Sequence, residues 1–514
     1  MSATEPIAGT CDMDGSKRTG GTVRLPTREV RRSLFLVSLA WAFGAIWITA
    51  VAGTPVTNFA KSLKASEFQY GLLAALPFIA SLLSFPASLL TEATGQRKRI
   101  FLWSLYPNRL LWIPIGLVPL WLIERYPGSE SIAMWTFLWL TFLMHTGQAV
   151  GGPAWVSWMA DIIPERKRGK YFGRRRQIGI LTAVPTALVV GWLLDTYARG
   201  DDARLMLRWC AVIFIAASVF GLLDIAIFHW VPDVPRKPRT GVHLLRAMRE
   251  PLRNRQFLWM GGFVAMIVFA VSFMGQYVTK YILEQLSARQ GWSVNIVTQM
   301  MLIVAPNVAA LLVINACGTA ADRMGKKPLL VLAGIGLAPV SIGWCFVTAD
   351  TVWLGYVLAI LGAALWQGVD VANWNLVMEV SGSTDNGNNG GSAYAAVNSV
   401  IINIAGMLGG LSAGVIAEAL EHWKWTTPIK TFTYYDVLFV MSGALRLLAV
   451  VVFLPHVHET HARPARETLR YITTSLYDNL FSAAQQPLKL LRVLRRNSAK
   501  GQQQRMPDTA LRTR

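Results

Sequence analysis

Three side chains with polar groups lie on one apolar stretch and are the residues best placed to do chemistry. Gln367, Asp370 and Trp374 recur at intervals of three and four residues within the run 352–380. Residues spaced this way share one face of a helix, and Asn373 lies beside that face. A carboxylate inside an apolar segment is costly unless it faces water, a partner or a substrate. We therefore expect Asp370 to bind a substrate or a coupling ion, with a structural hydrogen bond to a neighbouring helix as the alternative.

An internal repeat predicts what this face meets. When the stretch 132–160 is shifted by 219 residues, the interval from position 148 to position 367, it falls on 352–380 with three spaced identities. The aligned pairs are Gln148 with Gln367, Trp155 with Trp374, and Met159 with Met378. Membrane proteins built from internal repeats bind their ligands where the repeats meet. We therefore expect Gln148 and Trp155 to face the Asp370 side of the later stretch.

Further polar side chains in apolar stretches are candidates for the same site: His145, Gln276, Tyr277 and Arg109. Arg109 comes two residues after Pro107, which frees backbone groups around it, and a guanidinium there would suit an anionic substrate. Two other charges in apolar runs, Asp224 and Arg446, are interpreted as packing or snorkelling residues.

The composition is that of a membrane protein. Of the 514 residues, 53% are hydrophobic and only 15% are charged, and a helix needs about 20 apolar residues to cross a bilayer. A net charge of +20 could indicate nucleic acid, but the basic residues gather in the two ends of the chain and in alternate loops. That distribution follows the positive-inside rule and argues against a nucleic-acid partner.

Twelve apolar runs of spanning length follow one another. We predict helices at 33–59, 68–91, 100–123, 132–160, 178–198, 208–231, 257–283, 295–317, 328–349, 352–380, 393–420 and 436–455. The predicted organisation is a disordered leader (1–32), a six-helix bundle (33–231), a linker (232–256), a second six-helix bundle (257–455) and a basic amphipathic tail (456–514).

A charged hairpin joins two of these runs. Residues 318–327 read G-T-A-A-D-R-M-G-K-K, and a poorer copy occurs at 88–98. The spacing G-x-x-A-D-R-x-G-K-K resembles the loop signature of the major facilitator superfamily, and the loop 164–176, which follows Asp161, also resembles a loop of that family. The resemblance implies an all-α fold of twelve helices in two bundles, whose first, fourth, seventh and tenth helices line a cavity.

The hairpins and the helix ends near them are expected to form a latch that opens in each cycle. Asp322 would accept hydrogen bonds at a helix N-terminus, while Arg323 and the lysines would pair with Glu379 and Asp161. The residues assigned to gating are Gly318, Asp322, Arg323, Gly325, Lys326, Glu92, Arg97, Asp161, Arg168 and Glu379. Exposed pairs of this kind contribute about 1 kcal/mol or less, which suits a latch.

The resemblance implies a secondary transporter that moves a small solute by alternating access, coupled to protons or to sodium. We expect a monomer in a bacterial inner membrane, with both termini cytoplasmic and the basic tail on anionic lipid. No cofactor or metal is expected: the four cysteines form no close pair, and no phosphate-binding loop or catalytic set is present. The chain is not expected to be an enzyme. The alternative is a non-transporting scaffold or receptor of the same fold, which a flux measurement would distinguish.

Overall fold

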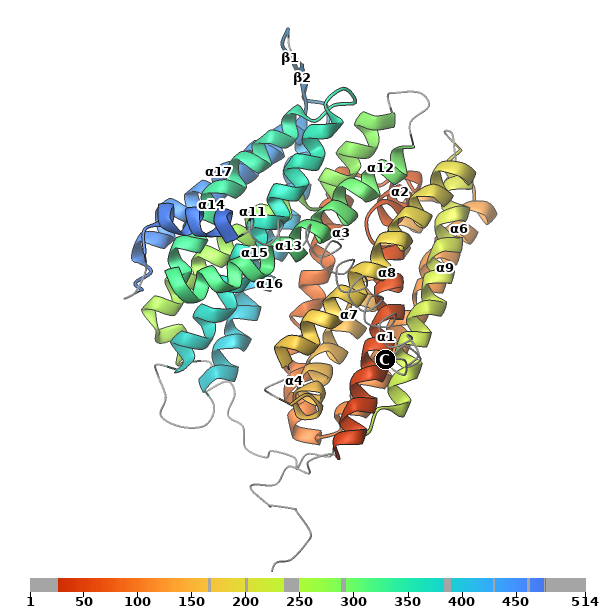
Figure 1. Cartoon of the computed structure of the whole chain (residues 1–514). Helices are drawn as coiled ribbons and strands as arrows, with labels where there is room; N and C mark the ends of the chain where they lie inside the picture. The colour runs from red at the N-terminus through yellow and green to blue at the C-terminus, as the bar shows by residue number, and fades with distance from the viewer. Residues whose placement is uncertain are drawn as a thin grey trace, which may run out of the picture.

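The computed structural model describes residues 26–164, 168–198, 202–234, 249–287, 293–382, 390–428, 430–459, 463–475 and 477. Most of these residues form twelve helical segments in two bundles of six, and a further helical stretch covers 465–475 (Figure 1). The first bundle runs from red to yellow in Figure 1 and the second from green to blue. The predicted all-α architecture is therefore confirmed.

The first bundle consists of α1 (Thr27–Val51) with α2 (Thr54–Ser62), α3 (Glu67–Ser81) with α4 (Ser84–Thr94), α5 (Arg97–Leu110) with α6 (Trp112–Arg125), α7 (Glu130–Ile162), α8 (Arg168–Tyr197), and α9 (Ala203–Ile227) with the 3-10 turn η2 (Phe228–Trp230). Its first three segments each break part-way. The α1–α2 break is at Gly53, whose φ of 72° is a conformation that suits glycine. The next two breaks lie near Leu82 and Leu110, four residues before Pro86 and Pro114, where a proline ring removes a helical hydrogen bond.

The second bundle consists of α11 (Arg255–Ser287), α12 (Val294–Gln299) with the π turn η4 (Met300–Val304) and α13 (Ala305–Met324), α14 (Lys326–Gly343) with η5 (Trp344–Phe346), α15 (Val352–Gly382), α16 (Gly390–Ala419), and α17 (Tyr434–Phe453) with η6 (Leu454–His456). A 3-10 turn, η3 (Pro251–Arg253), precedes it. Between α16 and α17, β1 (Trp425–Thr426) pairs antiparallel with β2 (Thr431–Phe432). This two-stranded hairpin was not predicted, because two-residue strands leave no alternating pattern.

Several predicted boundaries are corrected by the structure. Helix α1 begins at Thr27, inside the predicted leader, and α8 begins at Arg168, so that most of the basic segment 164–176 is helical rather than a loop. The polar segment 318–327 is also mostly helical, because α13 continues to Met324 and α14 begins two residues later. Gly325 alone makes the turn, with a φ of 98°. Positions 383–389, between α15 and α16, lie outside the described residues.

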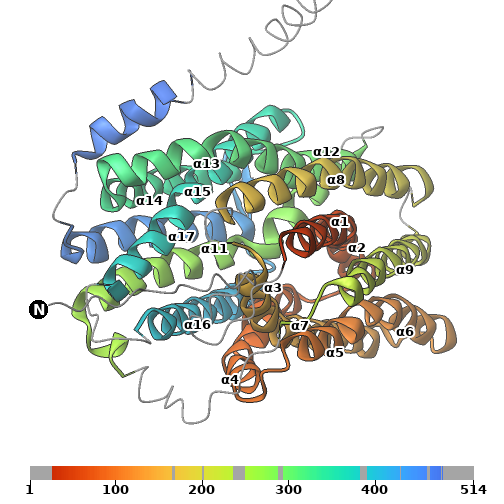
Figure 2. The ribbon, with the colours of Figure 1, turned by 60° about the horizontal axis from the view of Figure 1, so that its bottom comes forward.

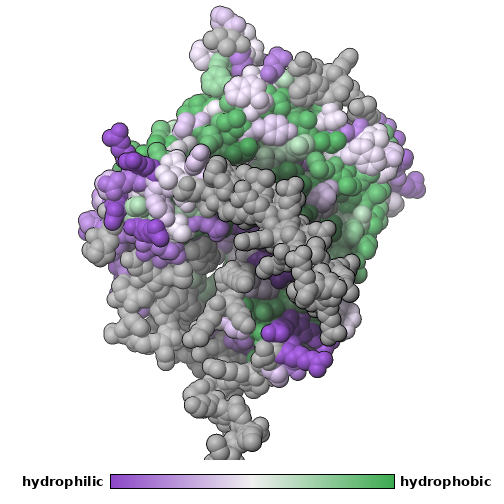
Figure 3. Space-filling model, in the orientation of Figure 1, coloured by the Kyte–Doolittle hydropathy of each residue, from purple (hydrophilic) through white to green (hydrophobic). Residues whose placement is uncertain are grey.

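Large apolar side chains cover the outside of the bundles. Examples are Trp103, Leu181 and Val451, each at least 70% exposed. In Figure 3, hydrophobic side chains cover much of the upper part and the right flank of the view. Ten helical segments among the described residues are long and apolar enough to cross a membrane. An exposed apolar surface of this extent belongs in lipid, so the chain is a multi-pass membrane protein.

Most of the packing between the two bundles lies toward one end. We call this the β1–β2 end, at the top of Figure 1, and the other the Gly325 end, which also holds the turn at Gly95. Contacts between the bundles run from α3 to α16, from α8 to α12, and from α2 and α3 to α11. Figure 2 views the molecule turned toward its lower end and shows α16 beside α3 and α12 beside α8.

The hydrophobic core divides in the same way. One cluster crosses between the bundles and includes Phe59 and Tyr70 of the first bundle with Tyr277 and Ala413 of the second. A second cluster, around Phe257, has its buried residues in the second bundle alone. A third, of which Phe101 and Trp158 are members, has its buried residues in the first bundle and the residues just after it.

Candidate functional site

A cavity of about 450 Å³ lies inside the second bundle. Its wall includes parts of α11, α13, α14, α15 and α17, together with one side chain of the first bundle, Arg176 on α8. Helix α11 is interrupted beside it at Gly275, where φ is 23° and a side chain would be strained. The lining is mostly apolar and includes Met274, Trp344 and Trp366.

The expected site face of α15 borders this cavity. Gln367 is 7% exposed, lines the cavity and accepts a hydrogen bond from Arg176 at 3.2 Å. Asp370, almost one helical turn further along, is exposed, accepts a hydrogen bond from the side chain of Trp366, and lies within electrostatic reach of Arg176. A charged group at this position therefore faces both bundles. Asn373 is buried on the same helix, and its Oδ1 has no hydrogen-bond partner among the described residues.

The structure does not place every predicted site residue in the cavity wall. On α7, Gln148 is exposed and His145 is half-buried, and neither lines the 450 Å³ cavity. Trp155 instead stacks with Arg175 of α8, with 4.7 Å from the guanidinium carbon to the ring centre. Helix α15 includes Trp374, whose side chain lies outside the described part of the structure. The pairing of α7 with α15 across a shared site thus stays a prediction.

Arg109 lies within the first bundle and has an acidic partner. Its guanidinium is 3.2 Å from Asp224 Oδ2 on α9, donates to Asn108 Oδ1, and stacks on Trp47 at 3.5 Å. The Arg109 and Asp224 side chains are both more than nine-tenths buried. The pair links α5 to α9, and the cavity described above does not include Arg109.

A buried ion pair closes the β1–β2 end. Glu67, at the start of α3, pairs with Lys280 on α11, and each is less than 10% exposed. Tyr277 is fully buried and donates its hydroxyl to the backbone carbonyl of Glu67 at 2.7 Å. Lys280 also donates to Tyr434 of α17 at 3.2 Å. The first and second bundles are thus joined by charge in a place from which water is excluded.

More polar contacts cross the same end. Asp195 at the end of α8 accepts hydrogen bonds from the backbone N–H groups of Asn295 and Ile296, at 2.9 and 2.8 Å, at the start of α12. Asn58 donates to the Asn295 side chain at 2.6 Å. Gln276, a predicted site residue, accepts from Thr57 at 3.2 Å. Gln276 and Tyr277 therefore belong to this closure rather than to the cavity wall.

Glycines allow α3 and α16 to touch along their backbones. A Cβ added at Gly71 would lie 2.4 Å from the Cα of Gly414 and 2.6 Å from the carbonyl oxygen of Gly410. Neither neighbour can move away without displacing α16. Small residues permit close helix packing, and here the neighbour of the α16 glycines is α3 of the other bundle.

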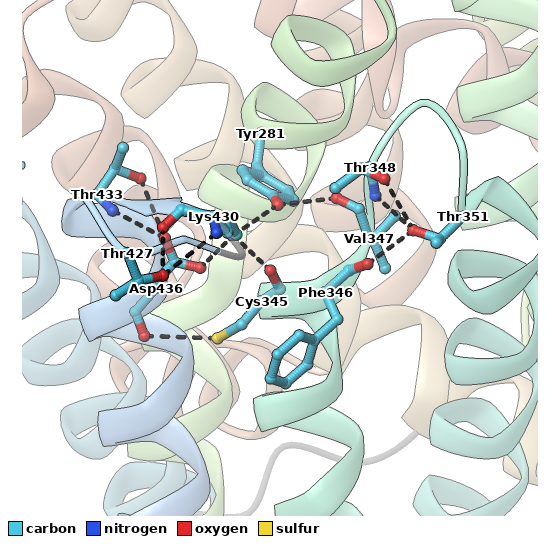
Figure 4. A network of polar contacts seen from close by, with 10 residues as sticks. All are labelled: Tyr281, Cys345, Phe346, Val347, Thr348, Thr351, Thr427, Lys430, Thr433 and Asp436. Carbon is cyan, nitrogen blue, oxygen red and sulfur yellow. Dashed lines mark hydrogen bonds and ion pairs between the residues drawn. The ribbon is translucent and has the colours of Figure 1, made fainter. Parts of the chain in front are cut away.

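A second buried charge holds the β1–β2 end of the second bundle together. Lys430 is 2.6 Å from Asp436 Oδ1, and it also donates to the Tyr281 hydroxyl at 3.3 Å and to the carbonyl of Cys345 (Figure 4). In Figure 4 its ammonium group lies between α11, η5 and the start of α17. Asp436 also caps α17, accepting from the backbone of Thr433 at 2.8 Å. These contacts make this end of the second bundle a single unit.

At the Gly325 end, the described contacts stay within each half of the chain. Arg97 is 2% exposed and donates to Asp161 at 2.7 Å, to the carbonyl of Ser157 at 2.7 Å and to the carbonyl of Val234 at 2.9 Å. The first hairpin copy therefore holds α5 against α7, with Asp161 paired to Arg97. Glu92 is half-buried, and the side chain of Arg168 lies outside the described residues.

The second hairpin copy is capped by the tail. Glu459 accepts from the backbone N–H groups of Lys326 at 2.9 Å and Lys327 at 2.8 Å, so it takes the helix-capping place that the sequence assigns to Asp322. Asp322 itself is exposed, and Arg323 lies over the ring of Tyr471 at 5.8 Å. Gly318 has open space around it. The side chain of Glu379, the other predicted acceptor, lies outside the described part of the chain.

The charged residues that close the β1–β2 end were not singled out from the sequence. Lys280 lies inside the predicted helix 257–283, and Asp195 lies inside 178–198. The rule that an ionisable residue within a spanning segment is a functional candidate would have found both. Glu67 stands one residue before its predicted helix and gives no such signal. Only the fold places it against Lys280.

Comparisons with known proteins agree with this architecture. The family model described as "Major Facilitator Superfamily" matches residues 33–409. The glucose facilitated diffusion protein of Zymomonas mobilis is 22% identical over 291 residues, covering 50% of this chain and 59% of that protein. Protein PucC of Cereibacter sphaeroides is 26% identical over 245 residues, covering 44% and 48%. The chain thus spans about half the length of the curated relatives it matches.

Solved structures share the fold. A D-xylose–proton symporter aligns with a TM-score of 0.59 and 15% identity, covering 84% of this chain and 98% of that one. The nucleoside transporter NupG aligns at 0.58 and 11%, covering 84% and 100%. The inward-open xylose transporter XylE from E. coli aligns at 0.57 and 17%, covering 86% and 99%.

Proposed function

Because the chain belongs to the major facilitator superfamily, we propose that it is a secondary active transporter that moves a small solute across the membrane by alternating access. The observation that carries this proposal is the asymmetry between its two ends. A shared hydrophobic cluster and the Glu67–Lys280 pair join the bundles at the β1–β2 end. At the Gly325 end each bundle has a cluster of its own. Such an arrangement suits one state of a cycle in which two rigid bundles rock about a central site.

The names of the relatives support a transport function but give different solutes. They include a glucose facilitated diffusion protein, a D-xylose–proton symporter and a nucleoside transporter. Two structural neighbours that match this fold are described as inward-facing or inward-open. We therefore take the described state as the one open to the inside, with the Gly325 end as the inner end.

The sidedness follows from charge. The basic residues of the chain gather at its two ends and in the loops at the Gly325 end, and positive loops remain on the cytoplasmic side. In this proposal the protein acts as a monomer in a bacterial inner membrane, with both termini cytoplasmic and its basic tail on anionic lipid.

Asp370 is the proposed coupling group. It is exposed at the inner side of the cavity and near Arg176 of the other bundle, so binding a proton or sodium ion would change the attraction between the bundles. A ligand shifts a conformational equilibrium only through such a difference between states. The conservative variant Asp370→Asn removes the charge and keeps the shape.

The test is solute flux in proteoliposomes containing the purified protein. A library of labelled sugars, nucleosides and organic acids is screened with and without an inward proton or sodium gradient, and Glu130→Gln serves as a control at an exposed pair. We expect one solute class to accumulate against its gradient, and Asp370→Asn to abolish accumulation while leaving exchange. If no solute moves under any gradient, while the folded protein captures a partner protein, the scaffold reading replaces the transporter.

A further inference from the structure

Arg446 is a buried cation with no acidic partner among the described residues. It is 4% exposed on α17, donates to the carbonyl of Leu337 at 2.8 Å and to the sulfur of Met274 at 3.4 Å, and lines the 450 Å³ cavity. No carboxylate lies within ion-pair distance of its guanidinium among the described residues, whereas Arg109, whose Nε is likewise without a partner, is paired with Asp224. A buried charge is normally paired, because removing it from water costs several kcal/mol.

Arg109 in the first bundle is a buried arginine with a structural role, and it provides a comparison for Arg446. Arg109 has Asp224, Asn108 and the ring of Trp47 around it. Arg446 has a neutral carbonyl, a thioether and an open cavity. The difference leaves part of the Arg446 guanidinium available to a group that enters from outside.

The rest of the cavity agrees with an anion that carries an apolar body. Arg176 contributes a second guanidinium at the wall, where it already donates to Gln367. Most of the remaining lining is aliphatic or aromatic, and Trp344 and Trp366 provide flat apolar surfaces. The volume falls within the range of small-molecule sites. Asp370 is not one of the wall residues, and Arg176, which is, lies within electrostatic reach of it and offsets part of its charge.

We propose that this cavity binds a monocarboxylate with an apolar body, its carboxylate on Arg446 and its body against the tryptophans. A planar guanidinium matches the two oxygens of a carboxylate, and the pair would satisfy the buried charge that the protein leaves open. The inference rests on the proposed function, since it names the substrate class of the transporter's own cavity.

The test measures binding and flux separately. Propionate, hexanoate, benzoate and phenylacetate, each paired with its primary amide, are titrated against the full-length protein in a non-ionic detergent by calorimetry. At least one carboxylate is expected to bind about tenfold or more tightly than its amide, because the neutral amide would leave the charge of Arg446 unpaired. Arg446→Gln removes that preference, and Arg446→Lys restores part of it. Arg208→Gln, at an exposed pair with Glu124, leaves it unchanged.

Two further readouts keep the result decisive. Should Arg446→Gln fail to fold, Arg176→Gln tests the same cavity from the other bundle and is expected to weaken carboxylate binding severalfold. Without ligand, Arg446→Met is expected to melt no lower than the wild type, because it removes an unpaired charge; a purely structural arginine would lower the melting temperature.

The outcomes separate the inference from the function on which it rests. Carboxylate binding that depends on Arg446, with no flux in proteoliposomes, supports the site and overturns the transporter. Flux of a neutral solute, with all four carboxylates binding no better than their amides, supports the transporter and overturns the anion site. Carboxylate binding that survives in Arg446→Gln also overturns it.

Discussion

The two ends of this molecule are built on different principles. At the β1–β2 end, the bundles share a hydrophobic cluster, a buried ion pair and a glycine contact between α3 and α16. At the Gly325 end, Arg97 holds α5 against α7 within the first bundle, and Glu459 caps α14 within the second. One end joins the halves of the chain, and the other stabilises each half by itself.

A rocking motion of the bundles would cost free energy mainly at the β1–β2 end. Opening the β1–β2 end would break the attraction between Glu67 and Lys280, but it would also expose both charges to water. Their hydration offsets part of the lost attraction. Opening the glycine contact between α3 and α16 loses packing, and no hydration of charged groups offsets that loss. Each polar contact can therefore re-form or be hydrated, and this end can act as a reversible closure.

The largest expected effect comes from Glu67→Gln. Lys280 would then stay buried with only Glu284, 3.9 Å away, as an acidic neighbour, and leaving a buried charge short of its partner costs about 3 kcal/mol. The closed population should fall by roughly a hundredfold. The readout is alkylation of a single cysteine, Thr57→Cys, by a membrane-impermeant maleimide, which should speed up. Glu130→Gln, at the exposed pair with Lys64, is the control. Unchanged alkylation in Glu67→Gln would show that the pair is not the closure.

A steric change at the same end should act next most strongly. Gly71→Val places carbon atoms where the backbone of Gly414 lies, and overpacking of this kind costs about 1–3 kcal/mol. Gly152→Val, on α7 with open space around it, is the matched control. We expect Gly71→Val alone to increase the alkylation of Thr57→Cys. Equal effects from both valines would mean that helix propensity, rather than the α3–α16 contact, is responsible.

Asp195→Asn should have a smaller effect. The asparagine keeps an oxygen for the start of α12 but loses the negative charge that favours a helix N-terminus, a difference of about 1 kcal/mol. The closed population should fall severalfold in the same alkylation assay. Asp202→Asn, which caps α9 within the first bundle, should leave alkylation of Thr57→Cys unchanged. An equal change in both variants would show that the contact of Asp195 with α12 is not part of the closure.

The smallest effect on the described state is expected at the Gly325 end. Asp322 is exposed, so Asp322→Asn should change the free energy of unfolding by less than about 1 kcal/mol. Its effect should appear instead in the opposite state, as slower flux and reduced closure at the Gly325 end. If flux and the accessibility of both ends are unchanged, the proposed latch at residues 318–327 is wrong.

The sequence predicts the fold well because each membrane-spanning helix is a separate apolar run in the sequence. Apolar runs of spanning length give all twelve segments, and the charged motif at 318–327 identifies the family. What the sequence misses are contacts between runs. Two helix breaks in the first bundle lie four residues before a proline, and a hydropathy pattern does not detect them. The proposed role of Arg446 depends on the cavity beside it, which the sequence does not reveal.

The candidate site is less predictable for the same reason. Gln367 and Asp370 share a face because helical spacing is local, and the structure places both near Arg176. No local spacing predicts what Gln276 and Tyr277 contact, and the structure places them in the closure with Thr57 and Glu67. The roles of all these residues stay predictions until ligand binding or flux is measured.

The central claim is that the two ends open in turn, and distances between spin labels test it most directly. In a cysteine-free background, labels at Arg99 and Arg323 report on the Gly325 end, and labels at Arg204 and Glu421 report on the β1–β2 end; all four positions are exposed. We expect two populations at each end with reciprocal weights, so that Glu67→Gln shortens the first distance and lengthens the second. A single distance at each end, the same in wild type and variant, would contradict alternating access.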